Sequence, residues 1–338
     1  MDRSHVSQNR SESWAIPLVS IRGWKTPRAT TGRGKCYEYE FGSGSNGFQT
    51  PSGNARSSRN TAEVTTFGMA DTYTLLVAGA RNVDAGKTTF ATGLVRKIGG
   101  IGFKPRAGND YWYDFDTVNA RLEDGRLVGN DAVRLAAASA GSPSAESLNP
   151  LHRLWRPIPS GSGTIFGREG SEFLVDRVGD RYVVNETTTL PAELSSALPL
   201  EDAVGVSTLE EINRLMADQH QPAVDRLRPR IEEEERVVIE SYADVARPIR
   251  GIDVDAVAVV GAGSARIYDG DRYCRAAEVA SGGPALGRLE ERVADVVDLL
   301  DPIETVQLPP LEQSVRDDPR ATATAYEPAY ERLIEAAV

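Results

Sequence analysis

Two adjacent residues, Lys87 and Thr88, have the side chains that a protein needs to hold a nucleoside triphosphate. They end the glycine-containing loop Gly79–Thr89, which follows a short apolar run. In such a loop the backbone N–H groups bind phosphate oxygens, the lysine reaches the β- and γ-phosphates, and the hydroxyl binds Mg²⁺. Lys87 is therefore a predicted catalytic residue, and the predicted phosphate contacts come from Asp84, Ala85, Gly86, Lys87, Thr88 and Thr89.

The loop departs from the usual pattern at one position, so its context has to support the prediction. The pattern G-x-x-x-x-G-K-[ST] requires glycine where this chain has Arg81. A Gly-Lys-Thr triplet arises often by chance, and an ordinary glycine-containing turn is the alternative. Two features favour nucleotide binding: the loop lies between a predicted strand and a predicted helix, and Lys87 is one of only three lysines after residue 68.

The elements around the loop alternate between strand and helix. The apolar run Leu75–Ala78 predicts a buried strand, and the spacing of Phe90, Leu94 and Ile98 predicts a helix from Lys87 to Ile98. Further strands are predicted at 101–104, 236–240, 256–260 and 303–308, and helices at 131–138, 293–300 and 325–337. This alternation predicts an α/β fold with a doubly wound, mostly parallel sheet and helices on both faces.

One stretch interrupts the alternation and predicts an insertion over about 160–235. It contains a predicted β-hairpin at 173–184 and an acidic segment at 210–235. Thr208 with Glu211 has the spacing of a capping box, which predicts a helix beginning there.

Residues 1–68 differ in composition from the rest of the chain. They carry nine Lys and Arg against five Asp and Glu, a net charge of +4. Because the whole chain has a net charge of −11, residues 69–338 have a net charge of −15. They are rich in Ser and Gly and have no sustained apolar period, so we expect this segment to be disordered. Met69 is a candidate start of the translated protein, and a genuine flexible tail is the alternative.

Composition narrows the classes of partner and cofactor. The net charge of −11 argues against nucleic-acid binding, and no apolar run approaches the roughly 20 residues of a membrane helix. We therefore predict a cytoplasmic protein. Two cysteines and three histidines are too few for a Cys/His zinc site. Of the 38 basic residues 33 are arginines, and an acidic, lysine-poor surface predicts a halophilic source, with a GC-rich genome as the alternative.

Short matches connect the loop with more than one family. The segment Val83–Thr89 resembles the loop of translational GTPases, but no Asn-Lys-x-Asp motif follows, which excludes that family. The segment Asp84–Thr88 is similar to the loop of polynucleotide 5′-hydroxyl kinases, which stays open as an alternative.

A longer resemblance is to the dethiobiotin synthetase family of phosphate-loop NTPases. It consists of short segments that follow one another in the family's order over residues 72–312: Phe103–Gly108, Asn130–Leu135, Leu148–Leu151, Pro157–Pro159, Val237–Glu240 and Val306–Pro309. The resemblance departs after Glu240, where the family has a glycine-rich run and this chain has Ser241–Asp244. The substrate pocket is therefore not matched.

The resemblance implies roles for individual residues. Thr88, Asp131 and Glu240 would hold Mg²⁺, which prefers oxygen ligands. Lys104 would be a second catalytic residue that neutralises charge on a carboxylate or phosphate. The alternatives are a helix N-cap for Asp131, a solvated carboxylate for Glu240 and a surface lysine for Lys104.

Two other groups of residues have structural interpretations that we favour. The aromatic cluster Tyr111–Tyr113 could stack on a ring, but we expect it to pack under its loop. His152 could act as a base, but we expect it on a helix surface.

The sequence therefore predicts an ATP- and Mg²⁺-dependent ATPase or ATP-dependent ligase, similar to dethiobiotin synthetase, that acts on a small carboxylate or amine. The expected partner is this small-molecule substrate, and a homodimer is left open. A nucleotide-dependent switch that binds a protein partner is the main alternative.

Overall fold

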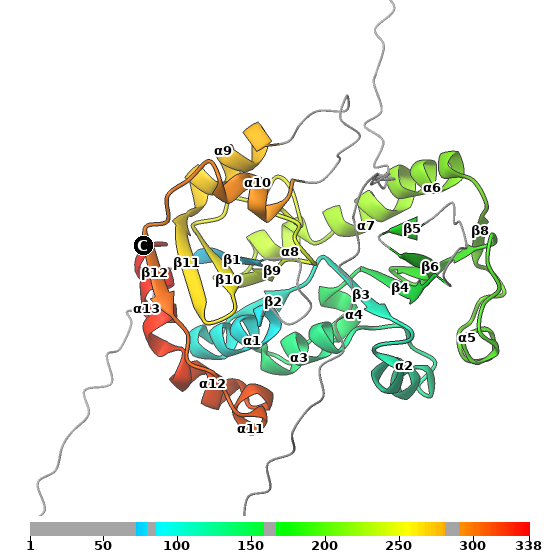
Figure 1. The fold of residues 1–338 in the computed structure, drawn as a ribbon, viewed down its shortest axis with the longest axis horizontal. Helices are drawn as coiled ribbons and strands as arrows, with labels where there is room; N and C mark the ends of the chain where they lie inside the picture. Colours follow the sequence, from blue (N-terminus) through cyan, green and yellow to red (C-terminus); the bar gives the residue numbers. More distant parts are fainter. Residues whose placement is uncertain (1–71, 80–85, 159–166, 169, 281–290) are drawn as a thin grey trace, which may run out of the picture. The chain divides into compact units, whose positions relative to one another are not determined.

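The structure is a computed structural model, and it describes residues 72–79, 86–158, 167, 168, 170–280 and 291–338. The expectations for residues 1–68 and for Asp84 and Ala85 lie outside the described residues. The strands form two sheets of six strands each, which we call sheet A and sheet B (Figure 1). The sequence predicted a single sheet, and this prediction is wrong: the fold is α/β with two mixed sheets.

Sheet A contains the strands predicted around the glycine-containing loop. Its order is β12-β11-β10-β1-β9-β2. The neighbours β10, β1, β9 and β2 run parallel, and β11 and β12 join antiparallel at one edge. The strands are β1 Tyr73–Gly79, β2 Ile101–Phe103, β9 Arg236–Glu240, β10 Ala256–Gly261, β11 Ser264–Asp269 and β12 Glu304–Gln307.

Both faces of sheet A are covered, because alternate residues of β1 enter two different apolar clusters. Leu75 and Val77 pack with Phe90 and Leu94 of α1 (Lys87–Ile98) and with Leu333 near the C-terminus. Leu76 packs in the other cluster, with residues of α9 and α10. The helices belonging to this sheet are α3 Asn130–Ala138, α8 Arg228–Glu232, α9 Gly270–Ala280, α10 Val293–Val297, α11 Gln313–Asp317, α12 Pro319–Ala325 and α13 Glu327–Glu335.

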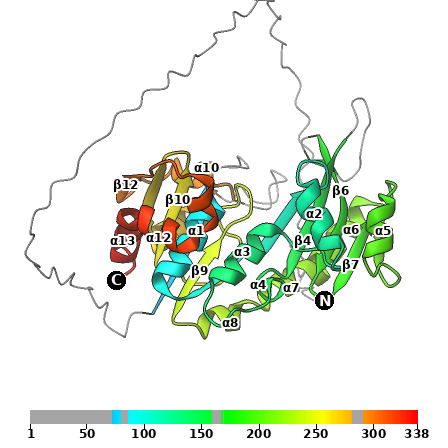
Figure 2. The ribbon, with the colours of Figure 1, turned by 90° about the horizontal axis from the view of Figure 1, so that it is seen from below.

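Sheet B has the order β3-β4-β6-β7-β8, with β5 paired to β6. Figure 2 labels its strands β4, β6 and β7. Its strands are β3 Arg106–Asp110, β4 Leu151–Pro157, β5 Gly167–Arg168, β6 Ser171–Val178, β7 Arg181–Asn185 and β8 Val204–Val206. The β6–β7 hairpin confirms the one predicted at 173–184. The strands β3 and β4 precede residue 160, so the segment 160–235 covers only part of this sheet.

The remaining helices belong to the region of sheet B or connect it to sheet A. They are α2 Phe115–Leu122, α4 Ala145–Leu148, α5 Ala192–Ala197, α6 Leu209–Leu215 and α7 Gln221–Asp225, and a π-helical turn η1 spans Met216–His220. The capping box at Thr208 and Glu211 is confirmed at the start of α6. None of the helices in the described ranges is long and apolar enough to cross a membrane.

Candidate functional site

The first turn of α1 begins at a glycine, which has no side chain to cap the helix. Gly86 takes the N-cap position with φ 80° and ψ 8°, and within the described residues no side-chain cap is found there. The first turn also contains no acidic residue. An uncapped helix N-terminus with its partial positive charge is suited to an anion such as a phosphate. This is the place where the sequence predicts the phosphate contacts.

Glycine is needed at the end of β1 for the side chain of Lys87 to pass. A Cβ atom on Gly79 would lie 2.5 Å from the carbonyl oxygen of Val260 and 3.0 Å from Cδ of Lys87. The lysine stem therefore runs against the bare backbone of residue 79, and its ammonium donates to the carbonyl of Ala243 at 2.8 Å.

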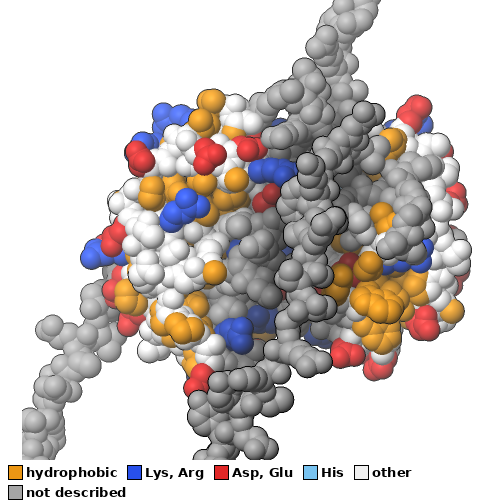
Figure 3. All heavy atoms as spheres, viewed as in Figure 1, with side chains coloured by type: hydrophobic (Ala, Val, Ile, Leu, Met, Phe, Trp, Pro, Cys, Tyr) orange, Lys and Arg blue, Asp and Glu red, His pale blue; other side chains and the backbone are white. Residues whose placement is uncertain are grey.

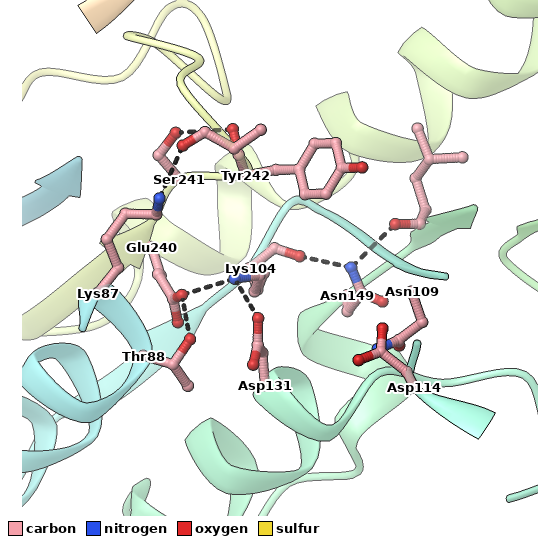
Figure 4. Close-up of polar contacts among 12 residues, drawn as sticks. Lys87, Thr88, Lys104, Asn109, Asp114, Asp131, Asn149, Glu240, Ser241 and Tyr242 are labelled. Atoms are coloured by element: carbon pink, nitrogen blue, oxygen red, sulfur yellow. Dashed lines mark hydrogen bonds and ion pairs between the residues drawn. The ribbon is translucent and has the colours of Figure 1, made fainter. Parts of the chain in front are cut away.

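Beside Lys87, four side chains from four separate segments meet (Figure 4). Thr88 Oγ1 donates to Glu240 Oε1 at 2.6 Å. Lys104 Nζ lies 2.6 Å from the same Glu240 oxygen and 2.9 Å from Asp131 Oδ2. Thr88 lies in the first turn of α1, and Lys104 directly follows β2. Asp131 lies in the first turn of α3, and Glu240 is the last residue of β9. The sequence predicted each of them individually, and the structure brings them together.

The fold explains why Glu240 is at the centre. The parallel pairing of β9 with β1 places Glu240 opposite Val77, next to the strand that leads into the loop. Glu240 and Lys104 have 0% and 3% of their side chains exposed, whereas Asp131 is 47% exposed. The solvated-carboxylate alternative for Glu240 and the surface-lysine alternative for Lys104 are therefore wrong. Asp131 is not a helix N-cap either, because Gly129 takes that position.

Burial and pairing determine the charges in this cluster. Burial opposes a charged ammonium, but the carboxylates of Asp131 and Glu240 outweigh it and raise the pKa of Lys104 above its ordinary value. Burial also raises the pKa of Glu240. For Asp131 burial is opposed by Lys104, which holds the pKa of this carboxyl below its usual range. Burial, with repulsion from Lys104, lowers the pKa of Lys87.

The oxygen atoms of the cluster fit Mg²⁺ with a nucleotide better than a metal ion alone. Glu240 Oε2 is buried and has no hydrogen-bond partner among the described residues, so this carboxylate oxygen has capacity for a ligand. No group of three or more His, Cys, Asp or Glu residues suited to a metal was found in the described ranges. Mg²⁺ is commonly bound through one or two carboxylates plus substrate phosphates, which Thr88, Asp131 and Glu240 would complement.

The segment that follows Glu240 contributes contacts that the sequence did not predict. Ala243, the acceptor for Lys87, has a φ of 50°, a left-handed conformation that costs a residue with a Cβ atom about 1–2 kcal/mol. The hydroxyl of Tyr242 accepts a hydrogen bond from Trp155 Nε1 of β4 at 3.1 Å. In the sequence, the one signal for this segment is that Ser241–Asp244 lacks the glycine-rich run expected from the resemblance.

Two sequence-based expectations outside the cluster are wrong. The expectation for Tyr111–Tyr113 is wrong for Trp112 and Tyr113, which are 74% and 79% exposed, whereas Tyr111 does pack against a buried apolar cluster. They border an open pocket of about 420 Å³ together with Arg156, Pro157 and Pro191. Figure 3 shows hydrophobic side chains gathered on the sheet B part of one face.

His152 does not lie on a helix surface but in β4, where it is 1% exposed. Its Nδ1 atom has no hydrogen-bond partner. Burial, with the nearby charge of Arg177, lowers the pKa of His152 to about 3. The imidazole is therefore neutral at physiological pH and packs as part of the protein interior.

Comparisons with family models, with curated proteins and with solved structures found no match to this chain.

Proposed function

We propose that this chain is a phosphate-loop NTPase that binds a Mg²⁺–nucleoside triphosphate, with ATP as the expected nucleotide, at the N-terminus of α1. The observation that carries the proposal is the meeting of Thr88, Asp131 and Glu240 beside an uncapped helix N-terminus and Lys87. A glycine-containing turn with no ligand would have no need of a buried carboxylate with an unpartnered oxygen.

Each residue of the candidate site has a defined role in this proposal. The N–H groups of the first turn of α1 bind phosphate oxygens. The ammonium of Lys87 leaves the carbonyl of Ala243 and binds the terminal phosphates. Thr88, Asp131 and Glu240 hold the metal ion, which neutralises phosphate charge when bound.

For the reaction, we propose ATP hydrolysis or ATP-driven ligation on a small carboxylate or amine. The ordered resemblance to the dethiobiotin synthetase family supports this class of reaction. The loop Ser241–Asp244 occupies the place of the family's glycine-rich run, so the substrate differs from that of dethiobiotin synthetase.

The test is calorimetric titration of Mg·ATP at high salt into the wild-type protein and Lys87→Ala. We expect saturable binding by the wild type and none by the variant, because the variant lacks the ammonium that meets the terminal phosphates. Lys97→Ala is a matched control, because Lys97 lies at the other end of α1 and pairs there with Glu327. Equal affinity for Lys87→Ala and the wild type would refute the proposal.

One observation favours a second candidate function, a nucleotide-dependent switch. The segment that holds Lys87 through Ala243 also contacts Trp155 of sheet B through Tyr242. Movement of Lys87 to a phosphate would release this segment and change its contact with sheet B. Turnover stimulated by a small-molecule substrate supports the enzyme; nucleotide binding without such turnover supports the switch.

A further inference from the structure

The ammonium of Lys104 lies where a metal ion would have to compete with it. It bonds both carboxylates that would ligate Mg²⁺, at 2.9 Å from Asp131 and 2.6 Å from Glu240. The Glu240 oxygen that it contacts also accepts the hydroxyl of Thr88. All three proposed metal-binding side chains are therefore connected through one lysine and one carboxylate oxygen.

The position of Lys104 is fixed from both sides of its backbone. Its N–H donates to the carbonyl of Leu148 at 3.0 Å, and its carbonyl accepts from Asn149 Nδ2 at 2.7 Å. Asn149 is itself fully buried. The side chain is 3% exposed, so the ammonium is held beside the two carboxylates and acts as their counter-ion.

We propose that Lys104 is a positioning residue that admits a divalent metal only together with the nucleotide. The inference rests on the proposed function, since it concerns the same metal site. Lys104 holds Asp131 and Glu240 in place and occupies part of their coordination capacity. A metal ion that enters alone must share these carboxylates with a fixed positive charge.

The charges of the site explain why the nucleotide would remove this barrier. Lys87 and Lys104 contribute two positive charges, and Asp131 and Glu240 contribute two negative charges. A divalent cation that enters alone adds two positive charges to these four groups. The phosphates of a bound nucleotide supply the missing negative charge. Charges in a partly buried site interact much more strongly than in water, so this difference in charge is enough to decide occupancy.

The experiment measures binding of Mn²⁺, used in place of Mg²⁺, by the electron paramagnetic resonance signal of the free ion. Without nucleotide, we expect the wild-type protein to bind Mn²⁺ only weakly. With a non-hydrolysable ATP analogue, we expect it to bind one Mn²⁺ ion much more tightly. Lys104→Met should bind Mn²⁺ without nucleotide at least about tenfold more tightly than the wild type, because the competing charge is gone.

Two control variants locate the ion and separate charge from packing. Lys104→Arg keeps the positive charge and should behave as the wild type. Asp131→Asn added to Lys104→Met should abolish the gained affinity, because one of the two carboxylates is lost. Thermal melts of each variant report whether it is folded.

Two results would overturn the inference: Mn²⁺ affinity of Lys104→Met no higher than that of the wild type, or wild-type binding of Mn²⁺ that is equally tight with and without nucleotide. If Lys104→Met does not fold, the wild-type comparison still decides. Failure of the proposed function gives a different result: the wild type then binds no nucleotide. The measurement on Lys104→Met without nucleotide still tests the role of Lys104 in that case.

Discussion

Glu240 in sheet A and Asp176 in sheet B are both fully buried carboxylates paired with a cation, but their oxygens are used differently. Both oxygens of Asp176 are bonded, because Arg153 donates to each of them at 2.6 Å and His220 Nε2 lies 2.8 Å from Oδ2. In Glu240 one oxygen accepts hydrogen bonds from both Thr88 and Lys104, and the other has no partner in the part of the chain that the structure describes.

The surroundings of the two acids differ in the same way. The guanidinium of Arg153 lies over the ring of Phe173 at 4.8 Å, and His220 ends the π-helical turn. π-Helical turns are frequent at functional sites, but here the turn places His220 against Asp176 in the interior. Lys104, the cation beside Glu240, also forms an ion pair with Asp131, which is half exposed.

The comparison separates a structural ion cluster from a ligand site. A buried carboxylate with both oxygens bonded within the protein is occupied by structural contacts, and those of Asp176 connect β4, β6 and the π-helical turn. A buried carboxylate with one unpartnered oxygen beside an exposed acid can accept a metal ion. We therefore expect substitutions at Asp176 to affect stability and substitutions at Glu240 to affect ligand binding.

The largest expected effect is on stability, in Asp176→Asn. The substitution leaves the buried guanidinium of Arg153 without its carboxylate, which typically costs about 3–5 kcal/mol. Urea unfolding measures the change in the free energy of unfolding. Asp131→Asn is the matched control, and it should cost less than about 1 kcal/mol because Asp131 is 47% exposed. Equal losses in the two variants would contradict the comparison.

The next effect is on ligand binding, in Glu240→Gln. The amide keeps an oxygen for Thr88 and Lys104 but removes the negative charge that the metal needs, so Mg·ATP should bind about 100-fold more weakly, or roughly 3 kcal/mol. Calorimetry measures the affinity, and urea unfolding should show a smaller loss of stability than in Asp176→Asn. Unchanged Mg·ATP affinity would place the metal elsewhere.

A third prediction concerns pH and sheet B. The pKa of His152 is lowered by burial to about 3, whereas in the unfolded chain it is about 6.5. Between these values the unfolded chain binds a proton that the folded chain does not, so stability falls as the pH falls. From pH 7 to pH 5 the wild type should lose about 2 kcal/mol more of its unfolding free energy than His152→Gln. Parallel losses in the two proteins would show that His152 is accessible to protons.

The smallest expected effect concerns the contact between the segment after Glu240 and sheet B. Tyr242→Phe removes the hydroxyl that accepts from Trp155 Nε1, which should cost about 1 kcal/mol of stability. Because Trp155 is nearly buried, its fluorescence should also change. Replacing Trp14, Trp24 and Trp112 by Phe in both proteins leaves Trp155 as the one tryptophan of the sequence. An unaltered spectrum and stability would mean that this hydrogen bond does not connect the two regions.

The sequence predicted the parts of sheet A whose side chains follow one local rule. Leu75–Ala78 and Val237–Ile239 are apolar runs bounded by polar residues, and Phe90, Leu94 and Ile98 have helical spacing, so strand and helix follow from burial alone. The candidate site was predictable for the same reason, since its residues lie at the ends of these elements. The resemblance then named Asp131 and Glu240 as metal ligands.

Sheet B could not be predicted in the same way, because its strands depend on partners far along the chain. The strand β3, Arg106–Asp110, has no apolar alternation and contains a glycine. In β4 Arg153 pairs with Asp176 of β6, and His152 Nδ1 is buried with no hydrogen-bond partner among the described residues. Local patterns do not reveal such cross-strand pairing, so His152 was assigned to a helix surface.

The most direct test of the account is a crystal structure grown with Mg²⁺ and a non-hydrolysable ATP analogue. The account predicts the terminal phosphates on Lys87, which has left the carbonyl of Ala243, and a metal ion about 2.1 Å from Thr88 Oγ1 with Asp131 and Glu240 around it. The cluster of Asp176 in sheet B should be unchanged. A nucleotide bound away from α1, or a metal ion with no ligand from this cluster, would contradict the account.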